Sequence, residues 1–122
     1  MNQTVKKVLD YLKANGGGNS KVIEEWHEGT EWYRVWSSGL IEQGGLADIT
    51  SASDGKEVTF LKAFSTVILN MTATVKDNTE GYYLAFGCFT DGSISLTGVT
   101  VRALNSVDTA IKAKVFWYAA GY

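Results

Sequence analysis

Residues 32–45 read WYRVWSSGLIEQGG and contain the pattern that decides the fold. Successive side chains of an extended strand point to opposite faces, so Trp32, Arg34 and Trp36 share one face. Tyr33 and Val35 then share the other face. The Ser-Ser-Gly sequence that follows permits a turn, and the segment LIEQ is expected to return as a further short strand. The stretch therefore predicts a β-hairpin whose two faces differ in chemistry.

The same two-residue period recurs on both sides of this hairpin. A strand is expected before it at 21–28, and others after it at 57–64, 65–75, 81–90, 93–104 and 111–122. Between them, segments 51–57, 76–81, 90–92 and 105–110 hold the Gly, Asn, Asp and Ser that form turns. Strands at such short spacing are typical of an all-β sandwich or barrel. We predict an antiparallel β-sandwich domain over residues 19–122.

Residues 1–18 follow a different period and predict a short N-terminal α-helix with a glycine-rich joint. Val5, Val8 and Leu12 follow a three-then-four spacing, which is a coiled-coil seam. So short a helix is marginal alone, and its apolar face needs either its own domain or the same helix in neighbouring chains. The Gly-Gly-Gly joint favours neighbouring chains, and valine at both seam positions favours three of them. A homotrimer is the resulting expectation.

Composition argues against several classes of function. The 11 Lys and Arg stand against 13 Asp and Glu without a basic cluster, so we expect no nucleic-acid partner. The apolar runs are far shorter than the roughly 18 residues of a membrane span, so we expect no membrane insertion. The one cysteine, Cys88, lies in AFGCFT. Its neighbours Phe86 and Phe89 predict that it is buried and slow to react with thiol reagents.

No catalytic or metal-binding constellation can be assembled from the motifs. His27 is the one histidine, and a zinc motif needs more His or Cys ligands at set spacing. A Ser-His-Asp triad could use only His27, and the sequence has no G-x-S-x-G nucleophile elbow before a helix. The sequence GGGNSK lacks the ending of a phosphate-binding loop and is expected to be a linker. We therefore expect no enzyme activity, no cofactor and no metal. Paired carboxylates for glycoside cleavage stay open, because acids in the predicted loops could face a cleft. These acids are Asp54, Asp77, Glu80, Asp91 and Asp108.

The central stretch resembles the C-terminal tip domains of bacteriophage tail fibres. In that family an aromatic pair with Arg or Lys leads into Ser-x-Gly, one or two hydrophobic residues and Glu-Gln-Gly. The matching positions here are Trp32, Tyr33, Arg34, Ser37, Gly39, Glu42, Gln43 and Gly44. The ending VFWYAAGY is similar to the aromatic-rich close of the family, and the likeness covers roughly residues 20–122. One departure is Leu61, which stands where the family often has proline.

The resemblance implies a homotrimeric fibre tip, made in the host cytoplasm and carried on the virion with other tail-fibre proteins. It also implies attachment to a bacterial surface receptor, for which we expect a polysaccharide. Trp32, Arg34 and Trp36 are then expected at a subunit seam, with Arg34 stacked between the two indoles. A sugar platform is the alternative for these aromatics. A purely structural trimerisation module and a glycan-degrading enzyme are the alternatives for the whole chain. Receptor contacts are expected in the turns around Asp77, Asn78, Asp91 and Asn105.

Overall fold

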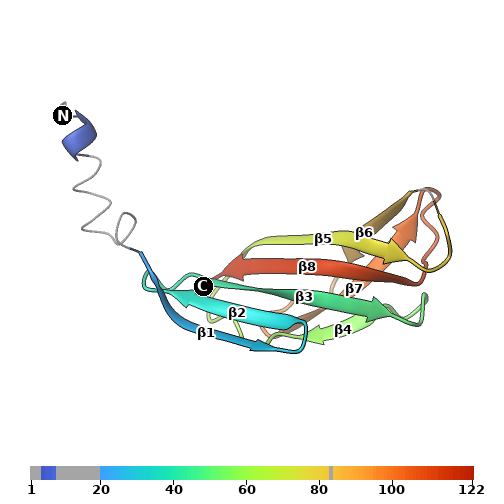
Figure 1. Cartoon of the computed structure of the whole chain (residues 1–122), viewed down its shortest axis with the longest axis horizontal. Helices are drawn as coiled ribbons and strands as arrows, with labels where there is room; N and C mark the ends of the chain where they lie inside the picture. The colour runs from blue at the N-terminus through green and yellow to red at the C-terminus, as the bar shows by residue number, and fades with distance from the viewer. Residues whose placement is uncertain (1–3, 8–19, 83) are drawn as a thin grey trace.

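The computed structural model describes residues 4–7, 20–82 and 84–122. Residues 4–7 form one helical turn, in which Val5 is 48% exposed. The other two residues of the expected helical seam, Val8 and Leu12, lie outside the described residues, as does most of the predicted helix. The rest of the described chain is built from strands, which confirms the all-β class (Figure 1).

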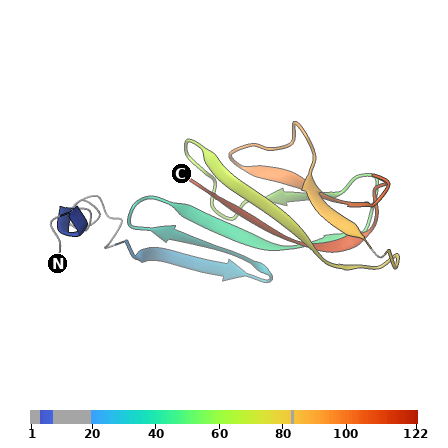
Figure 2. The ribbon, with the colours of Figure 1, turned by 90° about the horizontal axis from the view of Figure 1, so that it is seen from above.

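In the described part of the chain, eight strands form two antiparallel sheets that pack face to face (Figures 1 and 2). The five-stranded sheet has the order β1-β2-β3-β8-β5, and the three-stranded sheet has the order β4-β7-β6. The strand bounds are β1 Val22–Glu28, β2 Glu31–Trp36, β3 Ile41–Ile49, β4 Lys56–Thr59, β5 Ile68–Asn78, β6 Ala85–Phe89, β7 Gly98–Asn105 and β8 Ala113–Gly121. Figure 1 looks onto the outer face of the five-stranded sheet, with the smaller sheet behind it.

Strand β3 is longer than the predicted strand LIEQ, because it continues through Gly44 and Gly45 to Ile49. Glycine is a poor strand residue, but here a side chain has no room. A Cβ on Gly44 would lie 2.6 Å from the Trp117 carbonyl oxygen and 3.3 Å from the Trp32 ring. Gly44 therefore leaves room for the Trp32 ring of the neighbouring strand, and Gly45 leaves room for Glu31 and the Trp117 indole.

The core lies between the two sheets and is formed by alternate residues of β3, β7 and β8, with contributions from β4 and residues 60–64. Trp117 is its largest side chain, and the Phe60 ring lies 5.7 Å from it, centroid to centroid. Phe60 in turn meets Phe64 edge to face at 5.3 Å. A strand was expected over 57–64, but β4 ends at Thr59 and the chain turns inward to place both phenylalanines in the core.

The buried Gln43 fixes this irregular segment. Its side-chain nitrogen donates to the Lys62 carbonyl at 2.6 Å, and its side-chain oxygen accepts from the Lys62 amide at 3.2 Å. An amide side chain thus satisfies both backbone groups of a residue that lies outside the sheets. The Lys62 side chain then reaches Glu24 of β1 at 3.2 Å, which ties the β1–β2 hairpin to the body.

The prediction that Cys88 is a buried core thiol is wrong. The residue lies in β6 opposite Arg102 and is only partly buried, because strand alternation places it on the outer face with the exposed Phe86. The inward positions of β6 belong to Gly87 and Phe89 instead. Burial still raises the pKa of the Cys88 thiol, while the Arg102 charge opposes that shift.

Candidate functional site

The outer face of the five-stranded sheet gathers the aromatic residues of the central stretch. Strand register places Trp32 beside Gly44, Arg34 beside Glu42, and Gly44 beside Tyr118. We call this surface the aromatic face. It comprises Trp32, Arg34, Trp36, Glu42, Leu46, Phe116 and Tyr118.

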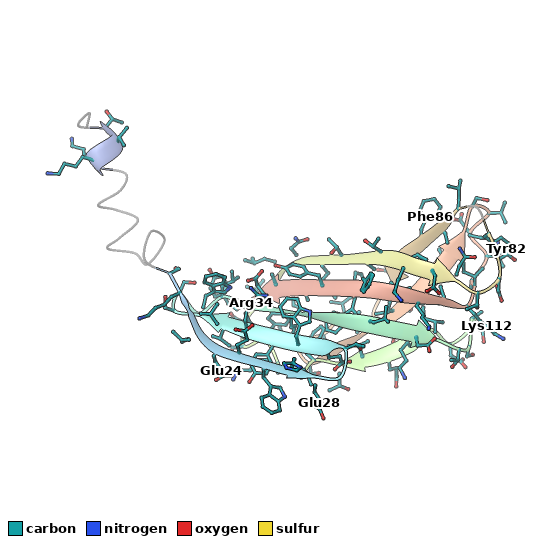
Figure 3. All side chains as sticks on the ribbon, viewed as in Figure 1. Glu24, Glu28, Arg34, Tyr82, Phe86 and Lys112 are labelled. Atoms are coloured by element: carbon teal, nitrogen blue, oxygen red, sulfur yellow. The ribbon has the colours of Figure 1, made fainter. Side chains whose placement is uncertain are left out.

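The stacking predicted for Arg34 is confirmed on one side. Its guanidinium carbon lies 5.0 Å from the centre of the Trp32 ring, and Trp32 lies 6.4 Å from the Tyr118 ring. Trp36, expected to stack on the other side of Arg34, is held instead by a hydrogen bond from its ring nitrogen to Glu42. Arg34 lies over the sheet on the side facing the viewer in Figure 3.

Glu42 is the polar centre of the aromatic face. Its carboxylate accepts hydrogen bonds from the Trp36 ring nitrogen and, at 2.6 Å, from the Tyr118 hydroxyl. Partial burial acts to raise the pKa of Glu42, but these two hydrogen bonds and the Arg34 charge outweigh it and lower that pKa. The Arg34 Nε is buried and has no hydrogen-bond partner in the described part of the chain. The two hydrogen bonds thus hold the Trp36 indole and the Tyr118 phenol against Glu42.

Burial, together with the hydrogen bond to Glu42, raises the pKa of Tyr118 to about 12 from 10.0. The folded state holds this proton more tightly than the unfolded state, so the stabilisation is complete below pH 10 and is lost between about pH 10 and pH 12. We expect the unfolding free energy of the parent to fall more steeply over this range than that of Tyr118→Phe, measured by urea denaturation. Tyr122→Phe is the matched control, and it should keep the steep parental fall. Parallel pH profiles for the parent and Tyr118→Phe would contradict the assignment.

The aromatic face is open to solvent at its β8 side. Phe116 is 50% exposed. A shallow cavity of about 340 Å³ lies beside it, lined by Thr30, Trp32, Gly45, Leu46, Phe116 and Trp117. An exposed aromatic surface on a small domain usually marks a contact with another molecule.

The four loop residues expected to bind a receptor have different surroundings. Asp77 and Asn78 are not in a turn, because β5 extends to Asn78 and pairs both with β8. The Asn78 side-chain amide donates to the Tyr82 carbonyl at 3.1 Å and accepts from the Tyr82 amide at 2.7 Å. Asn78 therefore positions the β5–β6 loop instead of reaching out from it, and Tyr82 is one of the exposed side chains of this loop (Figure 3).

Asn105 is the last residue of β7 and is 5% exposed, which corrects its placement in a loop. Its side-chain oxygen accepts hydrogen bonds from the Val107 and Thr109 amides, both at 3.0 Å. Asp91 is exposed in the β6–β7 loop, away from the other three residues. Turn chemistry thus indicated the neighbourhood of these loops, but three of the four residues belong to strands, and two of the amides are occupied in holding the loop backbone.

Among the described residues, no group of His, Cys, Asp and Glu is placed to hold a metal ion. The same residues contain no helix long and apolar enough to cross a membrane.

With its packed antiparallel sheets and its open aromatic face, the chain is an all-β domain with a surface suited to contact with another macromolecule. The chain belongs to the family described as "Putative tail fiber protein gp53-like, C-terminal", whose model matches residues 34–122. It is therefore a tail-fibre C-terminal domain. This match confirms the predicted resemblance to tail-fibre tip domains.

Three solved structures share the fold. An N-truncated R2-type pyocin tail fibre aligns with a TM-score of 0.59 at 19% identity, over 99% of this chain and 44% of that chain. An N-truncated R1-type pyocin tail fibre aligns with a TM-score of 0.56 at 19% identity, over 99% of this chain and 98% of that one. A C-terminal part of the P. aeruginosa R1 pyocin fibre aligns with a TM-score of 0.56 at 19% identity, over 84% of this chain and 28% of that chain. This chain thus spans less than half the length of the R2-type fibre and of the C-terminal part of the R1 fibre. No curated protein matches the sequence.

Proposed function

We propose that this chain forms the homotrimeric tip of a tail fibre and attaches the particle to a polysaccharide on the bacterial surface, without enzymatic activity. The observation that carries the proposal is the open aromatic face on a member of a tail-fibre family. Such a face is costly to expose, and burial between identical chains removes it from water.

The seam of the trimer is the aromatic face, including Trp32, Arg34 and Trp36. A cyclic trimer packs one patch of each subunit against a different patch of the next, so the aromatic face of one subunit would be covered by a second surface of its neighbour. Phe116, Leu46 and Trp32 supply apolar area, and the hydrogen bonds to Glu42 keep Trp36 and Tyr118 in place before subunits meet. The expected helical seam at Val5, Val8 and Leu12 would add to this contact upstream.

Receptor binding is assigned to surfaces that such a seam leaves free. The β3–β4, β5–β6 and β7–β8 connections lie together at one end of the sandwich (Figure 1). Each is held by a strand residue, since Arg102 donates to the Ala52 and Ser53 carbonyls while Asn78 and Asn105 hold the other two. Loops ordered in advance lose less entropy on binding.

A binding assay with whole cells tests this function. Fluorescently labelled chain should stain some strains of a bacterial panel saturably, with competition by unlabelled chain. Periodate treatment of the cells, which cleaves sugar diols, should abolish the staining. Absence of staining on every strain would favour a purely structural module. Release of reducing sugar from the surface polysaccharide would contradict the non-enzymatic assignment.

A further inference from the structure

Two adjoining cavities form a groove on the outer face of the three-stranded sheet, on the opposite side of the molecule from the aromatic face. The first has a volume of about 360 Å³ and the second about 540 Å³, and both are bordered by Glu57 and Thr100. Each is within the size range of small-ligand sites in proteins. We call them together the β4–β7 groove.

Strand register explains why the groove is polar. Glu57 pairs with Thr100, and Thr59 pairs with Gly98, so alternation turns these four residues outward while Val58 and Val99 enter the core. Gly98 has no side chain, and a Cβ there would clash with the Val58 carbonyl oxygen, so the two strands approach closely along the floor of the groove.

The β6–β7 loop forms one wall of the groove through Ser93 and Thr97. The Ser93 hydroxyl donates to the Thr90 carbonyl at 2.6 Å and accepts from the Thr100 amide at 3.0 Å, so this wall is fastened to the sheet. Asp54, Gly55 and Lys56 border the other end. The groove is thus formed before any ligand arrives.

The side chains of the groove are suited to sugar hydroxyls. Within the described part of the chain, the Glu57 carboxylate has neither a hydrogen bond nor an ion pair, and the Thr59 and Thr100 hydroxyls have no side-chain partner. Carboxylates accept and hydroxyls both donate and accept, which matches a diol. Asp54 and Glu57 against Lys56 leave the lining net negative, which disfavours an anionic sugar.

We propose that the β4–β7 groove binds a neutral saccharide, with Glu57 and Thr100 as its central contacts. The inference rests on the proposed function and names both the place and the chemical class of the receptor. A seam on the five-stranded sheet leaves this groove open in every subunit. Three grooves on one fibre tip raise the avidity for a repetitive polysaccharide.

The test uses the intact chain and purified bacterial polysaccharides, some neutral and some acidic. Parental protein should bind neutral polysaccharides and leave acidic ones unbound. Calorimetry with an oligosaccharide cut from a bound polysaccharide then compares variants. Glu57→Gln should weaken binding about tenfold or more, because charge-assisted hydrogen bonds become neutral ones. Thr100→Val, which keeps the shape of a strand residue, should weaken it about two- to tenfold.

Glu28→Gln is the matched control, since it removes an exposed carboxylate at the end of β1, outside the groove and outside the three loop connections. It should bind within twofold of the parent, and all variants should keep the parental melting temperature. If both groove variants bind with the affinity of the parent, the groove is not the saccharide site, and the proposed fibre-tip function stays intact. Binding to acidic polysaccharides alone, or binding to cells that periodate does not reduce, would overturn the saccharide class assigned to the groove. Failure of the parent to bind any cell would count against the proposed function itself.

Discussion

Replacing Trp117 by alanine is expected to lower the free energy of unfolding by about 3–5 kcal/mol. Trp117 is 4% exposed at the centre of the sandwich, where its ring lies against Phe60 and its neighbour Gly45 leaves room for the indole. Truncation removes the apolar contacts and leaves a cavity that the rigid sheets cannot close. A domain of this size has a total stability of about 5–15 kcal/mol, so the loss is a large part of it.

Trp117→Phe is the matched control for this change. It keeps an aromatic ring in the core and removes the indole nitrogen, which is buried without a hydrogen-bond partner in the described part of the chain. We expect it to cost clearly less than the alanine variant. Urea unfolding at one fixed protein concentration measures both, because assembly makes stability depend on concentration. Equal losses in the two variants would show that ring packing is not the source of the stability.

Phe116, the residue before Trp117, should affect the assembly of subunits and leave the folding of one subunit unchanged. Phe116 lies on the outer face and is 50% exposed in the single chain, so Phe116→Lys should leave the fold of one subunit intact. At a closed seam the same change buries a charge without a partner at three symmetric sites. We therefore expect a folded monomer at micromolar concentration, observed as a loss of mass in light scattering with an unchanged β-sheet circular dichroism spectrum.

Val107→Lys controls for adding a lysine at an exposed apolar position. Val107 is 75% exposed in the β7–β8 connection, remote from the aromatic face, and its variant should keep the parental mass. A Phe116→Lys protein that stays fully assembled would place the seam elsewhere. The neighbours Phe116 and Trp117 thus separate assembly from folding, because a strand sends them to opposite sides of one sheet.

Much of the fold follows from residue alternation. The period of two placed Trp32, Arg34 and Trp36 on one face, and strand register confirms this placement. The length of β3 could not be predicted, because Gly44 and Gly45 oppose a strand until Trp32 and Trp117 pack against them. Cys88 was assigned to the core because AFGCFT is apolar on both faces. The choice of face depends on Gly87, where an added Cβ would lie 2.9 Å from the Ala73 backbone of the opposite sheet.

The candidate sites depend more strongly on tertiary structure. Asn78 and Asn105 were expected in turns, but each is the last residue of a strand, and its side chain binds the backbone of the loop that follows. The β4–β7 groove escaped prediction because its partners, Glu57 and Thr100, are distant in sequence and meet only through strand pairing. Isolated Thr and Glu residues in a strand have no signal that distinguishes a groove from an ordinary solvent-exposed face.

If identical chains assemble through the aromatic face into a trimeric fibre tip, the mass of the particle in solution shows it. Light scattering coupled to size exclusion, on the intact chain at micromolar concentration, measures that mass directly. We expect a single species of about three times the 13.3 kDa chain mass. A single species at the mass of one chain, stable over a tenfold range of concentration, would contradict the trimer and with it the assignment of the aromatic face.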